Sequence, residues 1–287
     1  MNSQNEIIQK QNDDGMLKCQ YAARKYYNQA EILNYISWVI AFISSITFFI
    51  PESLGVISLI IPFIINILTL ILSYSIKCNV KLGAQMRNFF DEKVLGIGNS
   101  FSASDEHKIW EKANTLIEAR NNTFAYQSTH NGKDKPPGLK DWYVFTKSKY
   151  TPKEAVFECQ KQNYWWTEKL YRKRIQIYII VAIISLFISV IGFLISPLKT
   201  FLCLFSFVLK LCTDIVEFTH CNQAMKSIST ITNLKIESLN QSTLEELQQH
   251  IKERREIQIL EMNYFHKKNA YKWSSLYETT SIDRISH

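Results

Sequence analysis

The chain has 287 residues, of which 46% are hydrophobic and 21% are charged, and its formal net charge is +7. Its 17 Phe, 14 Tyr and 6 Trp residues exclude an intrinsically disordered protein. The six cysteines are scattered along the chain, which excludes a small disulfide-rich scaffold and favours reduced thiols.

Four apolar runs follow one another in two pairs. The first 31 residues are polar and precede runs at residues 32–50 and 54–76, and the second pair occupies residues 175–195 and 198–218. Each run has about 20 residues, the length that an α-helix needs to cross the ~30 Å hydrocarbon core of a bilayer. Because very few residues separate the two runs of a pair, the sequence predicts two tight transmembrane hairpins.

The predicted fold is an all-α membrane protein with four transmembrane helices in two hairpins and a mainly helical cytoplasmic domain. We expect five segments along the chain. They are a cytoplasmic N-terminal segment (1–31), the first hairpin (32–76), a basic and aromatic region that would sense a ligand (77–174), the second hairpin (175–218) and a cytoplasmic helical C-terminal region (219–287).

Basic residues gather at the ends of the runs that lie away from the hairpin tips, and Lys199 is the exception. By the positive-inside rule, this distribution places both termini and the middle segment in the cytoplasm. The basic residues concerned are Arg24, Lys25, Lys77, Lys81, Arg87, Lys169, Arg172, Lys173 and Arg174.

Helix signals divide the middle segment. The second run is expected to continue as an amphipathic helix over residues 81–94, until Gly96 ends it. A further helix is predicted over about residues 105–120, with Ser104 as its N-cap. Residues 131–138 are rich in Gly and Pro and predict a loop.

Two capping boxes predict the start of the remaining helices. Thr151 and Glu154 flank Pro152 and begin a helix that can continue unbroken into the third run, as a rigid rod. Ser242 and Glu245 begin a helix in the C-terminal region. Its apolar residues lie near one face, which is typical of a packing helix but would also suit a partner-binding helix. They are Leu244, Leu247, Ile251 and Leu260.

Residues 77–174 carry the whole net charge. Within residues 133–174, basic and aromatic side chains are interspersed. Such a surface suits a ligand that bears phosphates and bases. It suits equally an anionic lipid surface beside the third run, where Trp165 would be an interface anchor. The sequence leaves both interpretations open.

The fourth run carries charged residues at membrane depth, which a simple anchor does not need. They recur at helical spacing, and the second run repeats the pattern more mildly. One interpretation is a water-lined path formed on assembly, and the other is a polar network inside the bundle with Lys210 paired to Asp214. The candidate pore-lining residues are Asn66, Ser73, Ser206, Lys210, Asp214 and Glu217.

The sequence contains none of the common catalytic motifs, and its six histidines are dispersed. We therefore predict no enzymatic activity, no catalytic residues, no metal site and no cofactor.

Three motifs occur in order between the second and third runs. They are Phe90, Asp91, Val94, Leu95 and Gly96; then Lys140, Asp141, Trp142 and Tyr143; then Cys159, Gln160, Asn163, Trp165, Trp166, Leu170 and Arg172. In these motifs and in its two-hairpin layout the chain resembles the SMODS-associated four-transmembrane effectors of bacterial cyclic-oligonucleotide anti-phage systems (CBASS). It departs from that family at Thr167, where an acidic residue is frequent, and at Tyr171, where a basic one is frequent.

The resemblance implies an effector of abortive infection in the bacterial inner membrane. It would sense a cyclic oligonucleotide made by a cGAS-like nucleotidyltransferase and permeabilise the bilayer as a homo-oligomer, with no DNA or RNA polymer as partner. A base would stack on Trp142, Tyr143 or Trp165. The phosphates would meet Lys140, Lys147, Lys149, Arg172 and Arg174.

Two other functions fit the residues. The first is a non-conducting membrane scaffold or lipid-binding interaction protein, in which the basic region contacts the bilayer surface. The second is a small-molecule channel of an unrelated pathway.

Overall fold

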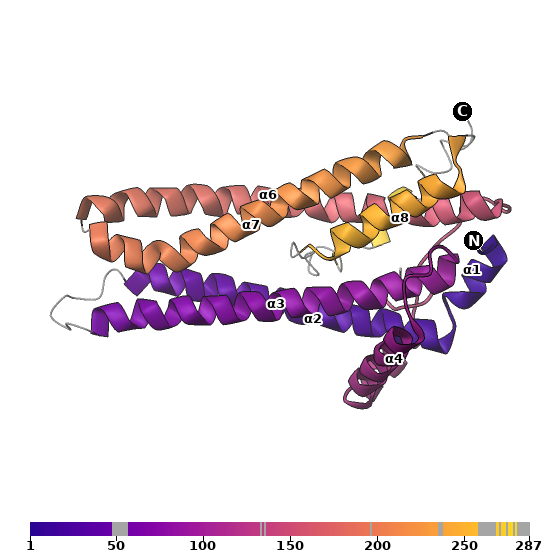
Figure 1. Cartoon of the computed structure of the whole chain (residues 1–287), viewed down its shortest axis with the longest axis horizontal. Coiled ribbons are helices and arrows are strands. Elements are labelled where there is room, and N and C mark those ends of the chain that lie inside the picture. Colours follow the sequence, from indigo (N-terminus) through magenta and orange to yellow (C-terminus); the bar gives the residue numbers. More distant parts are fainter. Residues whose placement is uncertain are drawn as a thin grey trace.

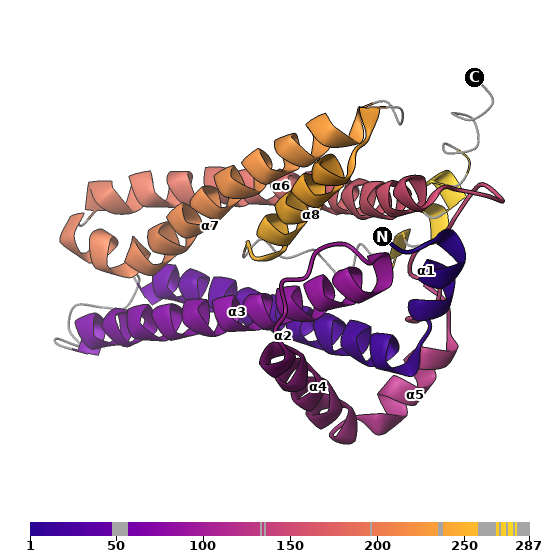
Figure 2. The same cartoon turned by 45° about the vertical axis from the view of Figure 1, so that its right-hand side comes forward.

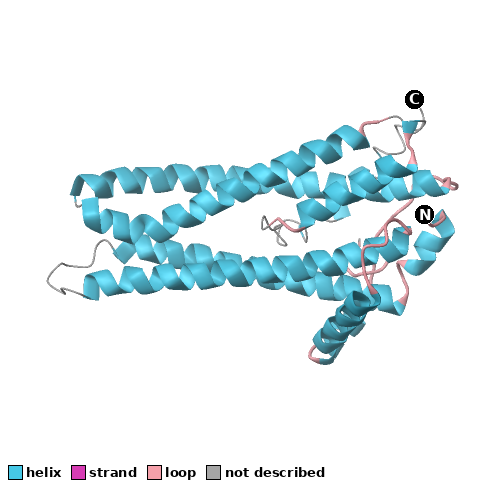
Figure 3. Cartoon of the chain, in the orientation of Figure 1, coloured by secondary structure: helices cyan, strands magenta, loops and turns pink. Residues whose placement is uncertain are grey.

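The computed structural model describes residues 1–47, 57–132, 134, 136–195, 197–234 and 238–257, together with 268, 269, 271–273, 275–277 and 279. Every regular element in these residues is a helix (Figure 3). An isolated bridge between Asn131 and Lys140 closes the predicted loop. The expected all-helical fold class is therefore confirmed for the described residues.

The described helices are eight in number and differ greatly in length. They are α1 (Gln4–Lys10), α2 (Asp14–Ile46), α3 (Ile57–Leu95), α4 (Ala103–Glu118), α5 (Asn121–Thr129), α6 (Pro152–Ile195), α7 (Pro197–Thr232) and α8 (Gln241–Arg255). The four long ones, α2, α3, α6 and α7, run along the length of the molecule as two antiparallel pairs (Figure 1). At 1.5 Å per residue, each is roughly 50–65 Å long, about twice the thickness of a bilayer core.

The molecule has two ends of different character. We call the end that carries α1, α4, α5 and α8 the head, and Figure 2 shows α4 and α5 projecting from it beside α2. The rest of the four long helices forms the stem (residues 32–46, 57–76, 175–195 and 197–218). The end of α2, the start of α3 and the junction of α6 with α7 all lie at the far end of the stem (Figure 1).

Two helices are long and apolar enough to cross a membrane, by length and composition, among the described residues. They span Ile60–Leu95 and Pro152–Leu194.

The predicted rod is confirmed. The N–H of Thr151 donates to Glu154 Oε2 at 2.8 Å, and α6 then continues from Pro152 without a break to Ile195. α3 likewise runs from the stem into the head and ends at Leu95. Each antiparallel pair therefore contains one helix that joins the head to the stem directly.

Two predicted N-caps are wrong. α4 is capped by Ser102, not Ser104, because Asp105 completes a capping box with Ser102. α8 is capped by Asn240, whose Oδ1 accepts from the N–H of Thr243 at 2.8 Å. Asn is as good an N-cap as Ser, and Ser242 instead donates its hydroxyl to the same oxygen at 2.7 Å.

Gly96 ends α3 as predicted. Its φ of +64° lies in the left-handed region, and its N–H donates to the carbonyl of Glu92. Asn2 covers the same helix end, since its backbone N–H donates to the carbonyl of Leu95 at 2.9 Å. The beginning of the chain is thus fixed to the head.

Substituting Gly96 with Ala should lower the free energy of unfolding by about 1–2 kcal/mol, because Cβ is disfavoured at this φ and would meet Asn2. Gly132→Ala is the matched control, because a Cβ there comes no closer than 3.9 Å to Lys140 O. Denaturant unfolding in detergent checks both, and equal losses in the two variants would contradict the assignment.

Candidate functional site

A buried carboxylate lies at the centre of the head. Asp91, on α3, is 0% exposed and both of its oxygens are bonded. Oδ1 accepts from the hydroxyl of Tyr143 at 2.6 Å. Oδ2 accepts from Arg255 Nη2 at 2.8 Å and from Gln248 Nε2 at 3.3 Å, both on α8. One carboxylate therefore joins α3, α8 and the segment between α5 and α6.

Neighbouring amides extend these bonds to α6. Asn163 donates to the Tyr143 hydroxyl at 2.9 Å, and Gln160 donates to Gln248 Oε1 at 3.0 Å. Arg255 Nη1 also donates to Asn88 Oδ1 at 3.0 Å. We call the set the Asp91 network: Asn88, Asp91, Tyr143, Gln160, Asn163, Gln248 and Arg255. Since α3 and α6 continue into the stem, the network couples the two antiparallel pairs.

Burial fixes the protonation of the network's donors. Burial, together with the charge of Asp91, raises the pKa of Tyr143 well above 10, so its hydroxyl remains a donor. Burial is the largest single effect on the pKa of Arg255 and lowers it, but Asp91, Tyr143 and Tyr27 together raise that pKa more, so the net shift is upward. Tyr143 therefore remains a neutral hydroxyl donor in the network, and Arg255 remains a cation.

The connection between α1 and α2 holds the motif that contains Tyr143. The side-chain amide of Gln11 accepts from the N–H of Tyr143 at 2.8 Å and donates to its carbonyl at 3.2 Å. Asn12 accepts from the N–H of Asp141 at 3.0 Å and donates to its side-chain Oδ1 at 2.9 Å. Asp141 has a φ of +50°, which Asp tolerates better than most residues. These bonds fix the backbone on both sides of Trp142.

Two arginines hold the same segment against the first pair of long helices. Arg24, on α2, donates to the carbonyls of Pro137 at 2.9 Å and Gly138 at 2.7 Å. Arg87, on α3, places its guanidinium 4.0 Å from the ring centroid of Trp142. The loop and the motif after it are therefore docked on α2 and α3.

The structure separates the candidate aromatic contacts. Tyr143 is 2% exposed and its hydroxyl belongs to the Asp91 network. Trp142 is half-buried beneath Arg87. Trp165, also half-buried, lies elsewhere on α6, where its ring contacts that of Tyr277 at 5.3 Å. These rings do not form one shared platform.

The candidate cations also differ in position. Lys140 and Lys147 are half-buried and Lys149 is exposed, all within the segment before α6. Arg172 and Arg174 lie on α6, and their side chains are outside the described part of the structure.

The sequence analysis missed Gln248 and Arg255, the partners of Asp91 on α8. It assigned Arg24 and Arg87 only to membrane orientation. A usable signal was the four-residue spacing of Arg87 and Asp91, which puts opposite charges on one helix face. The partner on α8 had no such local signal, because it lies far away in the sequence.

A second buried polar cluster lies in the stem. Lys210, on α7, is 1% exposed and donates to Asp214 Oδ1 and to Asn34 Oδ1, both at 2.8 Å. Its ammonium also lies 5.7 Å from the ring centroid of Trp38. Asn34 and Trp38 belong to α2, so the cluster links the two pairs within the stem. This ion pair is the arrangement that the bundle-network interpretation predicts.

The remaining candidate pore-lining residues are less enclosed. Asn66 and Ser73 on α3 and Glu217 on α7 are half-buried. The side chain of Ser206 lies outside the described part of the structure.

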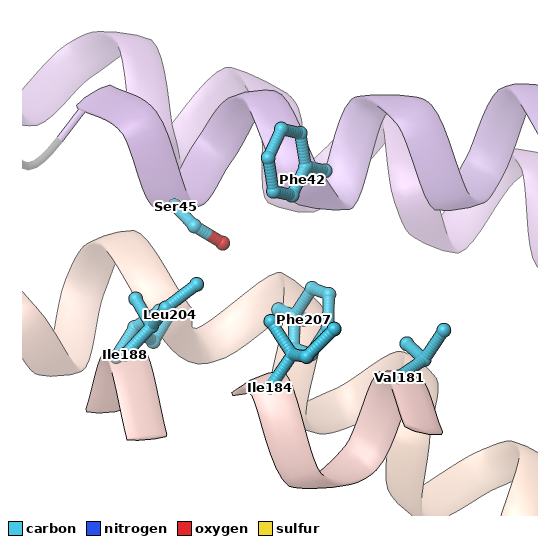
Figure 4. A pocket seen from close by; sticks show the side chains of 7 residues that line it. All are labelled: Phe42, Ser45, Val181, Ile184, Ile188, Leu204 and Phe207. Atoms are coloured by element: carbon cyan, nitrogen blue, oxygen red, sulfur yellow. The ribbon is translucent and has the colours of Figure 1, made fainter. Parts of the chain in front are cut away.

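An apolar cavity of about 170 Å³ lies beside this cluster. Figure 4 shows that its walls come from α2 on one side and from α6 and α7 on the other. The lining residues are Phe42, Ser45, Val181, Ile184, Ile188, Leu204 and Phe207. The Ser45 hydroxyl donates to the carbonyl of Ala41 at 3.2 Å, so the cavity offers little to a polar ligand.

Replacing Asp91 with Asn should lower the free energy of unfolding by about 3–5 kcal/mol, because Arg255 would stay buried without its counter-charge. The double variant Asp91→Leu/Arg255→Met should recover much of that loss, since it removes both charges. Glu111→Gln, at an exposed position on α4, is the control. Denaturant titration measures all three, and a small loss for Asp91→Asn would show that the pair is not needed.

Among the described residues, no group of three or more His, Cys, Asp or Glu side chains is arranged to hold a metal ion. The bonded groups of the head suit structural coupling between its helices.

Comparison with known families agrees with this architecture. The family model of the SMODS-associating 4TM effector domain matches residues 5–270, which cover the stem and helices α2 to α8 in full and all of α1 except Gln4. No curated protein and no solved structure matches the chain significantly. The protein therefore belongs to the SMODS-associating 4TM effector family.

Proposed function

We propose that the protein is a membrane effector of anti-phage defence that binds a cyclic oligonucleotide in its head and permeabilises the bacterial inner membrane. Family membership supports the link to SMODS-type signalling. The observation that carries the proposal is the continuity of α3 and α6, which meet in the Asp91 network and extend into the stem. A ligand that shifts the head therefore acts on both pairs of stem helices.

We propose further that all four long helices cross the membrane. Each presents large apolar side chains to its surroundings, for example Val39 (58% exposed) on α2 and Phe63 (65%) on α3. Leu194 on α6 is 83% exposed and Phe201 on α7 is 57% exposed. Such an apolar surface is stable in lipid but not in water. The basic residues of the head then place both termini in the cytoplasm.

Permeation requires several copies of the chain. A single bundle is filled by its own side chains, and Lys210 and Asp214 pair inside it. Binding of the nucleotide would favour a second arrangement in which these groups face water between subunits. We assign the pore lining to Asn66, Ser73, Ser206, Lys210, Asp214 and Glu217.

The candidate ligand contacts divide by accessibility. Lys140, Lys147 and Lys149 are reachable from solvent in the segment before α6, and Trp142 lies beside them. The buried ring of Tyr143 transmits the change to Asp91 rather than stacking on a base. Trp165, Arg172 and Arg174 would act where α6 approaches the membrane surface.

The direct test is dye release from liposomes that contain the purified full-length protein. Release should increase several-fold when cyclic di- or trinucleotides are added, and linear dinucleotides serve as the control. Equal release with and without every cyclic nucleotide would remove the gating proposal.

One observation favours the alternative of a non-conducting scaffold, namely that Lys210 is fully paired within the chain. Changing Lys210 and Asp214 together to Leu separates the two functions. The variant should fold at least as stably, because both buried charges are removed, yet nucleotide-dependent release should collapse. Val216→Leu, at an exposed position of α7, is the control. Wild-type release by the double variant would remove Lys210 and Asp214 from the pore lining, and no nucleotide-dependent release by the wild type itself would support the scaffold.

A further inference from the structure

Arg87 has a buried donor without an acceptor. Its Nη1 is excluded from solvent and, within the described residues, makes no hydrogen bond. The face of the guanidinium covers Trp142, but stacking leaves the N–H groups at its edge unsatisfied. Buried polar groups are almost always bonded, and an unmet charged donor costs more than a neutral one. The position of Arg87 therefore points to an acceptor supplied from outside the chain.

Positive charge exceeds negative charge around this donor. Asp91 lies one turn further along α3, but its oxygens already serve Tyr143, Gln248 and Arg255. Burial, followed by the charge of Arg255, lowers the pKa of Arg87. Burial, followed by the charge of Arg87, lowers the pKa of Arg24 to about 10. Arg87 is thus close enough to both Arg24 and Arg255 to be repelled by them, and the one carboxylate beside it, Asp91, is bonded to Arg255.

Gln20 supplies a second unsatisfied group on the neighbouring helix. Its side chain is 1% exposed, and neither its amide nitrogen nor its amide oxygen has a partner among the described residues. Gln20 lies one turn before Arg24 on α2, so the two side chains share a helix face. The paired helices α2 and α3 therefore both bring unused donors to the region beneath the loop.

We propose that Arg24, Arg87 and Gln20 form a binding site for a phosphate group. Guanidinium forks match phosphate oxygens in geometry, and an anion between them would offset their mutual repulsion. The identity of the ligand rests on the proposed function, because a cyclic oligonucleotide would place a phosphodiester here. Lipid headgroups and inorganic phosphate carry the same chemistry.

The site lies where it can act on the Asp91 network. Arg87 and Asp91 occupy successive turns of α3, and Trp142 precedes Tyr143 in the chain. Arg24 holds the loop through Pro137 and Gly138. A phosphate that draws the two arginines together would move the loop and Tyr143 relative to α6.

The test is thermal unfolding of the full-length protein in zwitterionic nanodiscs and chloride buffer. Inorganic phosphate, a cyclic dinucleotide or nanodiscs with anionic phosphatidylglycerol are the three arms. At least one arm should raise the Tm, and Arg87→Met should weaken the apparent affinity at least tenfold. Lys112→Gln, at an exposed position of α4, is the control and should bind like the wild type.

Unliganded stability separates a binding role from a structural one. In chloride alone, Arg87→Met and Gln20→Leu should keep or raise the Tm, because each removes an unsatisfied buried group. Arg255→Met should lower it, because that residue is paired with Asp91. If no arm raises the Tm, the site does not exist. The same holds if, in chloride, Arg87→Met and Gln20→Leu lower the Tm as much as Arg255→Met does.

The arms also identify the source of the phosphate. If the nucleotide raises the Tm at a lower concentration than inorganic phosphate does, the site binds the nucleotide. If the Tm rises only in anionic nanodiscs, the site binds lipid. If Arg87→Met binds all three phosphate sources like the wild type and its liposomes still leak on adding nucleotide, the site is refuted and the proposed function stands. If the nucleotide binds through Arg87 but no leakage follows, the proposed function fails and the site stands.

Discussion

The head depends on the burial of one carboxylate. An ionised Asp91 in a dry interior is stable only because Arg255, Tyr143 and Gln248 bond to it from two other parts of the chain. Each of these groups would in turn be costly if left alone. If α8, the loop or α6 separated from α3, buried polar groups would lose their hydrogen-bond partners. These elements are therefore held on α3 together.

The sequence predicted the features that local interactions determine, such as helix ends and helix lengths. The start of α6 at Pro152, the end of α3 before Gly96 and the long apolar runs follow from caps, glycine and length. The motifs containing Asp91 and Tyr143 were visible, but their contact was not, because it joins residues 52 positions apart. No periodicity reports such a pairing, and so Tyr143 was interpreted as a ligand contact instead of a buried donor.

The stem contains a second buried ion pair, between Lys210 and Asp214. Lys210 donates to Asp214 and Asn34 across the two pairs of helices, and these bonds lower the cost of burying its charge. Composition could place these residues on one helix face, but not decide whether they face water or each other. The structure shows these bonds within a single chain. A conducting assembly would have to replace them with bonds to water or to a neighbouring copy of the chain.

If all four long helices cross the membrane as proposed, the apolar cavity between α2 and the α6–α7 pair makes the fold depend on the surrounding lipid. Water would find few partners among its phenyl and aliphatic walls, so in a bilayer the space suits hydrocarbon tails. Tails wedged there would separate the two pairs, whereas stiffer or shorter ones would fill the space poorly. The ease with which the helices part is then a property of the surrounding bilayer as well as of the polypeptide.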